Sequence, residues 1–476
     1  MAEKTLDPST RRILPWLVAV AFFMQTLDST ILNTALPSMA RSLGESPLRM
    51  QSVVVSYMLT VALLIPASGF LADRFGTRRV FATAIVLFTV GSVTCAAART
   101  LNELVLARVL QGVGGSLLLP VGRLTILKAV PRSELLSVLA FVTIPGLIGP
   151  LVGPTLGGIL VETLSWHWIF LINVPMGVLG TALALKYMPE IREERTPFDW
   201  LGFILVGVGM VGISVSLEAF AEGSMPKGGT TITLVLGLAS FAAYVLHQTR
   251  VPYPLFHPGL WRIHSFSVGL AGNLFARLGS GAMPYLSPLF LQVGLGKPPT
   301  VAGMFMAFAV LGAMGSKIIV EKLVARLGYR RFLLTNTALL GITMMGFAWL
   351  PEDVSAVRLA AHLFIFGIFN SLQFSSMNTL TLSELDGETA SSGNSLLSMI
   401  MQLSMSFGVA SGAAILSAFA RGDAARASVQ EVSVLHAFQN TYICVGLLAL
   451  LSSLVFWQLS EKDGAPASAE GPPSEL

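Results

Sequence analysis

Three charged residues stand inside long apolar stretches of this chain, where a charge is expensive. Asp28, Arg108 and Arg277 each lie inside a run of roughly twenty apolar residues, long enough to cross a bilayer. Charged side chains at such depth usually face a partner, a water-filled cavity or a transported ion. A buried acid can carry a proton reversibly, and a guanidinium can grip a carboxylate through two hydrogen bonds. These residue types therefore indicate proton and ion handling inside a membrane.

The composition agrees with a membrane location. The 476 residues are 53% hydrophobic and 12% charged, whereas soluble proteins are about 25% charged. The basic residues sit in short loops rather than on one face, which argues against a nucleic-acid partner. The two cysteines, Cys95 and Cys444, lie in apolar stretches and predict neither a disulfide framework nor a metal site. No Walker A sequence, HExxH or nucleophile elbow occurs, so we expect neither an enzyme nor a cofactor.

Apolar windows separated by polar breaks predict an all-α polytopic membrane protein with about fourteen transmembrane helices. The predicted spans cover residues 14–37, 51–72, 80–98, 104–126, 136–162, 167–187, 200–219, 231–249, 266–292, 300–321, 331–350, 357–379, 393–418 and 437–459. Most Lys and Arg residues outside these spans fall on the side of the N-terminus, so the positive-inside rule places both termini in the cytoplasm.

One charged turn occurs twice in the chain, in two similar copies. The sequence "ADRFGTRR" occupies residues 72–79 and "VARLGYRR" occupies residues 324–331, both on the predicted cytoplasmic side. A repeat with the same sidedness predicts two halves related by an axis along the membrane normal, with the substrate between them. The copies differ where the first has Asp73 and the second has Ala325.

The repeat also predicts a domain division in which two extra helices are inserted between six-helix halves. The predicted parts are a cytoplasmic N-terminus (1–13), an N-terminal half (14–187), a linker with the two extra helices (188–250), a C-terminal half (251–459) and a disordered cytoplasmic tail (460–476).

With the residues before it, the first copy of the turn resembles the loop 2–3 signature of the major facilitator superfamily. The matching positions are Gly69, Asp73, Arg74, Gly76, Arg78 and Arg79. This resemblance implies the two-half fold, and a gate in which the aspartate and arginine lock the inner ends of the halves together. The alternative from the residues alone is a solvated loop that obeys the positive-inside rule.

The span predicted over 136–162 carries closely spaced glycines. Gly149, Gly153 and Gly157 are four residues apart and form a stripe that another helix can approach closely, and Pro154 removes a backbone donor. Together with Gly158, these residues resemble the signature associated with the antiporters of the superfamily, which implies export. Ordinary small-residue packing is the alternative.

Asp28 and Arg108 belong to two further motifs. Residues 27–37, "LDSTILNTALP", resemble the helix 1 signature of the fourteen-helix drug:proton antiporters of the EmrB/QacA type, which implies that Asp28 takes part in proton coupling. Residues 108–115, "RVLQGVGG", are similar to the intramembrane-arginine motif of the superfamily, and we assign Arg108 to proton coupling as well. The alternatives are a structural hydrogen-bonding role for Asp28, and an Arg108 that reaches the outer interface beside Glu103.

The matches extend to "WHWIFLINVPMG" at 166–177 and "SSGNS" at 391–395. His167 stands between two tryptophans where the family usually has arginine, and Met401 precedes Gln402 where the family usually has arginine. These departures resemble the MdtD/HsrA-like branch of the family, so substrate rules from well-studied multidrug members do not carry over.

The predicted substrate-binding positions are Arg277, Asn33, Gln111 and Gln402. Arg277 has no acid nearby in sequence, so we predict that it contacts an anion; pairing with Asp28 or with backbone carbonyls is the alternative.

We therefore expect a proton-coupled antiporter that exports small molecules, such as drugs or toxic compounds, from the cytoplasm across the inner membrane. Its expected partners are the substrate, protons and the lipid bilayer, with the chain acting as a monomer. An outer-membrane or membrane-fusion partner is left open, because nothing in the sequence calls for one. The alternatives are an exporter of an anionic metabolite or metal chelate, such as a carboxylate, and a non-export secondary transporter of the same fold.

Overall fold

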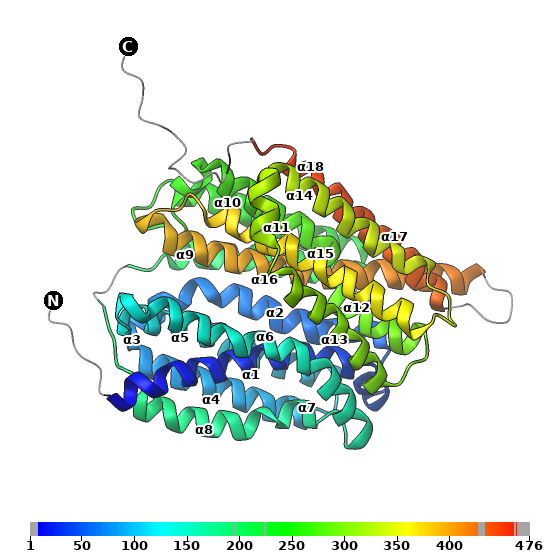
Figure 1. Ribbon diagram of the computed structural model, residues 1–476, viewed down its shortest axis with the longest axis horizontal. Coiled ribbons are helices and arrows are strands. Elements are labelled where there is room, and N and C mark those ends of the chain that lie inside the picture. The colour runs from blue at the N-terminus through cyan, green and yellow to red at the C-terminus, as the bar shows by residue number, and fades with distance from the viewer. Residues whose placement is uncertain (1–7, 194–196, 223–224, 427–433, 461–462, 464–476) are drawn as a thin grey trace, which may run out of the picture.

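The computed structural model describes residues 8–193, 197–222, 225–426, 434–460 and 463, and they form a bundle of long helices (Figure 1). No strand occurs in this described part of the chain. Thirteen of its helices are long and apolar enough to cross a membrane, which confirms the predicted all-α membrane fold. Residues 1–7 of the predicted N-terminal segment, and nearly all of the predicted tail, lie outside the described residues.

The first half of the bundle contains six spans. Its helices are α1 (Pro8–Leu43), α2 (Gln51–Leu64), α3 (Ser68–Phe75), α4 (Thr77–Ala97), α5 (Leu101–Ala129), α6 (Arg132–Thr163), α7 (Trp168–Leu171) and α8 (Asn173–Tyr187). Helices α2 and α3 belong to one span, interrupted by the 3-10 turn Ile65–Ala67. This turn contains Pro66, which cannot donate a helical hydrogen bond.

The second half follows an inserted hairpin. The hairpin is α9 (Trp200–Glu222) and α10 (Lys227–Gln248). The later helices are α11 (His264–Ser280), α12 (Met283–Leu289), α13 (Pro299–Ser316), α14 (Val320–Gly346), α15 (Ala356–Leu382), α16 (Gly387–Arg426), α17 (Val434–Leu451) and α18 (Ser453–Phe456). Short 3-10 turns cover Pro47–Met50, Pro258–Arg262 and Phe347–Trp349.

The ninth predicted span, 266–292, is not one continuous helix. It is broken at Gly281 and Ala282 into α11 and α12, and a π-turn over Phe290–Gly294 follows. Pro284 has no N–H to donate to the carbonyl of Ser280, four residues earlier in the chain. Pro288 likewise cannot donate to the carbonyl of Pro284. Irregular backbone at membrane depth is tolerated where protein or a cavity surrounds it, and this break borders the cavity described below.

The two copies of the charged turn adopt similar backbone conformations. Gly76 separates α3 from α4 with φ 92° and ψ 143°, and Gly328 kinks α14 with φ 72° and ψ 157°. Both values of φ lie in a region that glycine adopts without steric cost. We call the end of the bundle that carries these two turns the Gly76 end. The opposite end carries the α1–α2 turn at Gly44, and we call it the Gly44 end.

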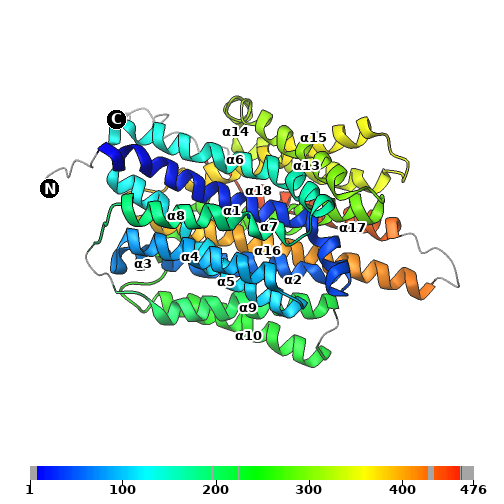
Figure 2. The ribbon, with the colours of Figure 1, turned by 90° about the horizontal axis from the view of Figure 1, so that it is seen from below.

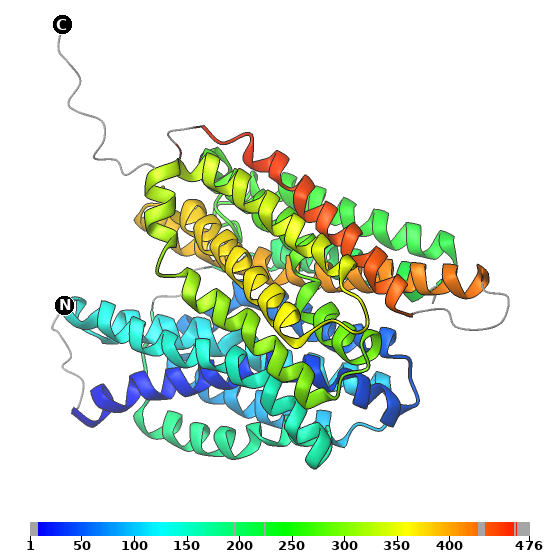
Figure 3. The ribbon, with the colours of Figure 1, turned by 45° about the vertical axis from the view of Figure 1, so that its right-hand side comes forward.

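The two halves meet at the Gly44 end, where α13 crosses α6 (Figure 3). The side-chain amide of Gln292 donates to the carbonyl of Thr34 at 2.9 Å. Thr300 donates from its backbone N–H and its hydroxyl to the carboxylate of Glu162, at 2.9 and 2.8 Å. These bonds all join residues that are more than a hundred positions apart, so they close this end of the bundle.

The inserted hairpin lies along one edge of the bundle (Figure 2). Val206 and Met210 of α9 belong to the same buried cluster as Ala62 of α2 and Leu403 of α16. Helices α2 and α16 come from different halves, so the hairpin covers one of the two seams between the halves. The other seam, between α6 and α13, contains the cavity described below.

Candidate functional site

Asp28 and Arg108 form a buried ion pair between α1 and α5. The Nη1 atom of Arg108 lies 2.7 Å from Oδ2 of Asp28, and each side chain is 1% exposed. Asp28 is the only acid buried within a membrane-spanning helix in the described part of the chain. Such a pair is tolerable only when further hydrogen bonds satisfy both groups.

Neighbouring helices supply these further bonds to the carboxylate. The side-chain amides of Gln111 and Asn173 donate to Oδ1 of Asp28, at 2.7 and 3.0 Å. Both amides also donate to the hydroxyl of Ser92 on α4, at 2.9 and 3.3 Å. Asp28 thus accepts at both oxygens, an arrangement that matches an ionised carboxylate.

The guanidinium of Arg108 is held on its other sides as well. It donates from Nη1 to Oε1 of Gln111 at 2.6 Å and from Nε to the carbonyl of Val53 at 3.3 Å. Its Cζ atom lies 4.2 Å from the centre of the Tyr57 ring, a cation–π contact. Arg108 therefore faces Asp28 in the interior rather than Glu103 at the interface.

We call Asp28, Ser92, Arg108, Gln111 and Asn173 the Asp28 network. Sequence analysis assigned Asp28 and Arg108 to proton coupling without pairing them with each other, assigned Gln111 to substrate binding, and missed Ser92 and Asn173. Asn173 stands in the motif "WHWIFLINVPMG", where a polar amide inside an apolar run was the available signal. Ser92 gave no signal, because a serine can satisfy its hydroxyl on its own helix.

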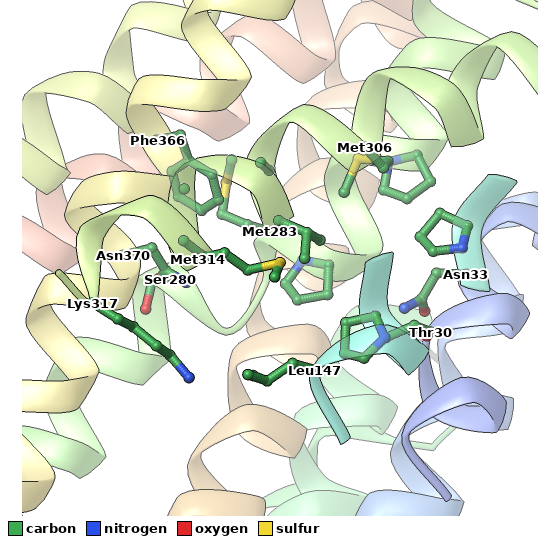
Figure 4. Close-up of a pocket in the computed structure, with 18 residues that line it drawn as sticks. Thr30, Asn33, Leu147, Ser280, Met283, Met306, Met314, Lys317, Phe366 and Asn370 are labelled. Atoms are coloured by element: carbon green, nitrogen blue, oxygen red, sulfur yellow. The ribbon is translucent and has the colours of Figure 1, made fainter. Parts of the chain in front are cut away.

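A cavity of about 340 Å³ lies beside the network, between the halves. Helices α1, α6, α13 and α15 and the break in the ninth span line it (Figure 4). Its lining residues are Thr30, Asn33, Leu147, Pro150, Pro154, Ser280, Met283, Pro284, Pro288, Met306, Ala309, Val310, Ala313, Met314, Lys317, Phe366, Gly367 and Asn370. A volume of this size suits a small organic molecule.

Helix α1 separates the cavity from the Asp28 network. Thr30 and Asn33 face the cavity, whereas Asp28 faces α5 and α8 on the other side of the same helix. A displacement of α1 would therefore change both sites together. The predicted substrate position Asn33 lines the cavity, but Gln111, Gln402 and Arg277 are not among the lining residues.

Arg277 lies near the cavity but faces a different set of groups. Its side chain is 6% exposed, and Nε donates to Oδ1 of Asn273 at 3.3 Å. Its Cζ atom lies 3.7 Å from the centre of the Phe374 ring. In the part of the chain that the structure describes, no carboxylate pairs with Arg277. Pairing with Asp28 is thus excluded in this conformation, and the anion contact stays a prediction.

The glycines of α6 contact two different helices. A Cβ on Gly157 would lie 2.6 Å from the carbonyl oxygen of Ile31, and Gly149 and Gly153 lie equally close to α1. The stripe predicted from their spacing therefore packs on α1. Gly158 faces the other half, where a Cβ would meet the carbonyl of Pro299, and Gly303 of α13 packs against the carbonyl of Pro154.

The turn at Gly76 is bound to residues of its own half and of the linker. Asp73 pairs with Lys128 of α5 at 3.1 Å, and Lys128 also pairs with Glu193 at 2.8 Å. The Nε atom of Arg78 donates to the carbonyl of Met188 at 2.5 Å, and Arg79 lies 3.9 Å from Glu190.

Of the other two gate residues, Arg74 has no carboxylate partner among the residues that the structure describes. Arg74 stacks on Phe70 and Phe75, and Gly69 has open space beside its Cα. In this conformation Asp73 therefore pairs with Lys128 of its own half, rather than with a residue of the other half. The resemblance had implied an arginine partner, and Lys128 lies too far along the chain for sequence to have singled it out.

His167, the departure from the family pattern, lies between the spans at the Gly44 end. Burial lowers the pKa of its imidazole, and its ring stacks on Trp166 with 3.8 Å between centroids. The position is therefore neutral at neutral pH, whereas the arginine usual in the family would be charged.

Replacing Asp73 with alanine is expected to change conformational balance rather than binding. The Asp73–Lys128 pair is partly exposed, and such pairs contribute about 0–1 kcal/mol. We expect substrate affinity to change by less than about tenfold. Cysteines placed at the two ends of the cavity should show more labelling at the Gly76 end and less at the Gly44 end. Unchanged labelling in Asp73→Ala would show that the lock does not bias the conformation. Asp353→Ala, at an exposed loop at the Gly44 end, is the control.

Comparisons with known proteins agree with this geometry. A family model described as the Major Facilitator Superfamily matches residues 18–409. A relative named multidrug resistance protein MdtD, from Citrobacter koseri, is 50% identical over 451 residues, covering 94% of this chain and 95% of that protein. A relative of the same name from Yersinia enterocolitica is 49% identical over 442 residues, covering 93% of each chain.

Solved structures show the same fold at much lower identity. A D-xylose-proton symporter has a TM-score of 0.66 at 14% identity and covers 95% of this chain and 99% of its own. A bacterial homologue of the lysosomal transporter Spinster, in an inward-facing conformation, has a TM-score of 0.66 at 14% identity, covering 95% of this chain and 97% of its own.

Proposed function

Because this chain belongs to the major facilitator superfamily, a family of multi-pass membrane transporters, we propose that it is a proton-coupled antiporter that exports small molecules. The relatives named multidrug resistance protein MdtD support drugs or toxic compounds as its substrates. We further propose that it lies in the inner membrane with both termini and the Gly76 end in the cytoplasm. The closed Gly44 end then corresponds to an inward-facing state.

One observation carries the coupling proposal: Asp28 is a buried acid on the helix that also lines the cavity. Protonation of Asp28 would remove the charge that holds Arg108, so the two helices would no longer be drawn together. The glycines that let α6 pack closely on α1 leave α1 a smooth surface along which to move. Proton uptake on one side of α1 and substrate release on the other are thereby linked.

Gradient collapse tests this proposal directly. The protein is placed in inverted membrane vesicles with an imposed proton gradient, and a panel of compounds is added in turn. We expect substrates to dissipate the gradient, and vesicles that lack the protein to show no such response. Compound uptake that leaves the gradient intact would contradict antiport, and would favour a uniporter of the same fold.

A further inference from the structure

We propose that the cavity takes a lipophilic anion, with an apolar body among its methionines and a single acidic group that pairs with Lys317. This inference rests on the transport function proposed above, because it names the class of substrate for that cavity. It differs from the prediction made for Arg277, which the structure places outside the lining.

The cavity wall suits an apolar body. Met283, Met306, Met314 and Phe366 supply most of its large side chains, and methionine adapts its shape to varied ligands (Figure 4). None of the lining residues is aspartate or glutamate, and Lys317 is the only charged one. A lipophilic cation would lose its hydration here without meeting a counter-ion, whereas an anion would meet one.

Lys317 is placed to receive an acidic group. It follows the last residue of α13 at the Gly76 end, and its side chain extends from α13 toward Leu147 of α6 (Figure 4). The side chain is exposed, and no carboxylate in the described ranges pairs with it. Its ammonium can therefore bind acidic oxygens, which a bound molecule or a lipid phosphate would both provide.

The position of the cavity favours molecules that dissolve in the bilayer. The cavity lies at the α6–α13 seam, while the α9–α10 hairpin covers the α2–α16 seam. Met314 lines the cavity and is also 38% exposed, so the cavity wall is not fully buried in the bundle. A lipophilic acid could thus enter from the adjacent leaflet with its charged group near Lys317.

A matched pair of probes tests the charge preference. 4-(Naphthalen-1-yl)butyrate and 4-(naphthalen-1-yl)butylamine share one apolar body and carry opposite charges at neutral pH. Their binding is measured on the full-length protein in lipid nanodiscs, with no proton gradient, so the result does not depend on proton coupling. We expect the butyrate to bind more tightly than the amine to the parent protein.

Lys317→Gln should weaken butyrate binding by about three- to tenfold, since one charge-assisted bond at a partly hydrated site is lost. Amine binding should stay level or improve, and Lys317→Arg should bind the butyrate like the parent. Lys322→Gln removes the same charge from an exposed position outside the lining, and it should change neither affinity.

Three results would overturn the proposal. The first is equal binding of the two probes by the parent protein. The second is loss of the preference for butyrate in Arg277→Gln but not in Lys317→Gln. The third is weaker butyrate binding after addition of phosphatidylglycerol, seen in the parent but not in Lys317→Gln. The third result would mean that Lys317 binds lipid phosphates. If phosphatidylglycerol instead weakens butyrate binding equally in the parent and in Lys317→Gln, the cause is repulsion at the membrane surface, and Lys317 still binds the acidic group of the substrate.

Discussion

Asp28→Asn is expected to abolish transport driven by a proton gradient. Asparagine keeps one acceptor for Gln111 and Asn173 but cannot take up or release a proton. It also leaves the guanidinium of Arg108 buried without its counter-ion, which costs about 3–5 kcal/mol in comparable buried pairs. The variant should therefore insert and fold with a lowered melting temperature. Gradient-driven efflux in proteoliposomes, at matched protein content, measures the loss.

A double variant separates coupling from stability. Asp28→Asn with Arg108→Gln removes both charges, so most of the lost stability should return, because no unpaired charge stays buried. Transport should nevertheless stay absent, since no titratable group replaces Asp28. Recovery of gradient-driven efflux in the double variant would contradict the proposed role, and would make the pair a structural element only.

The sequence identified the costly groups but not their partners. Asp28 and Arg108 were noticed because a charge inside an apolar span needs a reason. Their pairing depends on how α1 and α5 are rotated against each other, which no local pattern records. Neutral amides such as Asn173 cost less to bury, so they are common in membrane helices and give a weaker signal.

Local backbone features were present in the sequence, but their conformations were not predicted. The repeated turn was recognised from its residues, and the structure adds that Gly76 and Gly328 both adopt a positive φ. Pro284 and Pro288 were present in the ninth span, yet proline in a membrane helix does not always break it. The role of Lys317 was invisible, because a lysine at the cytoplasmic end of a helix is what the positive-inside rule predicts for any span.

Gly303→Leu is expected to drive the protein out of the conformation described here. The Cβ of any larger residue at this position would overlap the carbonyl of Pro154, which is backbone and cannot turn aside. Overpacking of this kind costs about 1–3 kcal/mol, and the cost applies only while α13 and α6 are closed at the Gly44 end. The closed population should fall by about 5- to 150-fold relative to the open one.

Accessibility at Thr34 measures this shift. In a background without Cys95 and Cys444, Thr34→Cys should react with a membrane-impermeant maleimide only when the Gly44 end opens, since Thr34 is buried here. Gly315→Leu is the matched control, because a Cβ on Gly315, on the same helix, meets nothing within 4 Å. Equal labelling in both variants would mean that the Gly303 contact persists in all states. A rise confined to Gly303→Leu would instead make the α6–α13 contact part of the moving gate, and would place Gly158, which packs against the carbonyl of Pro299, in that gate as well.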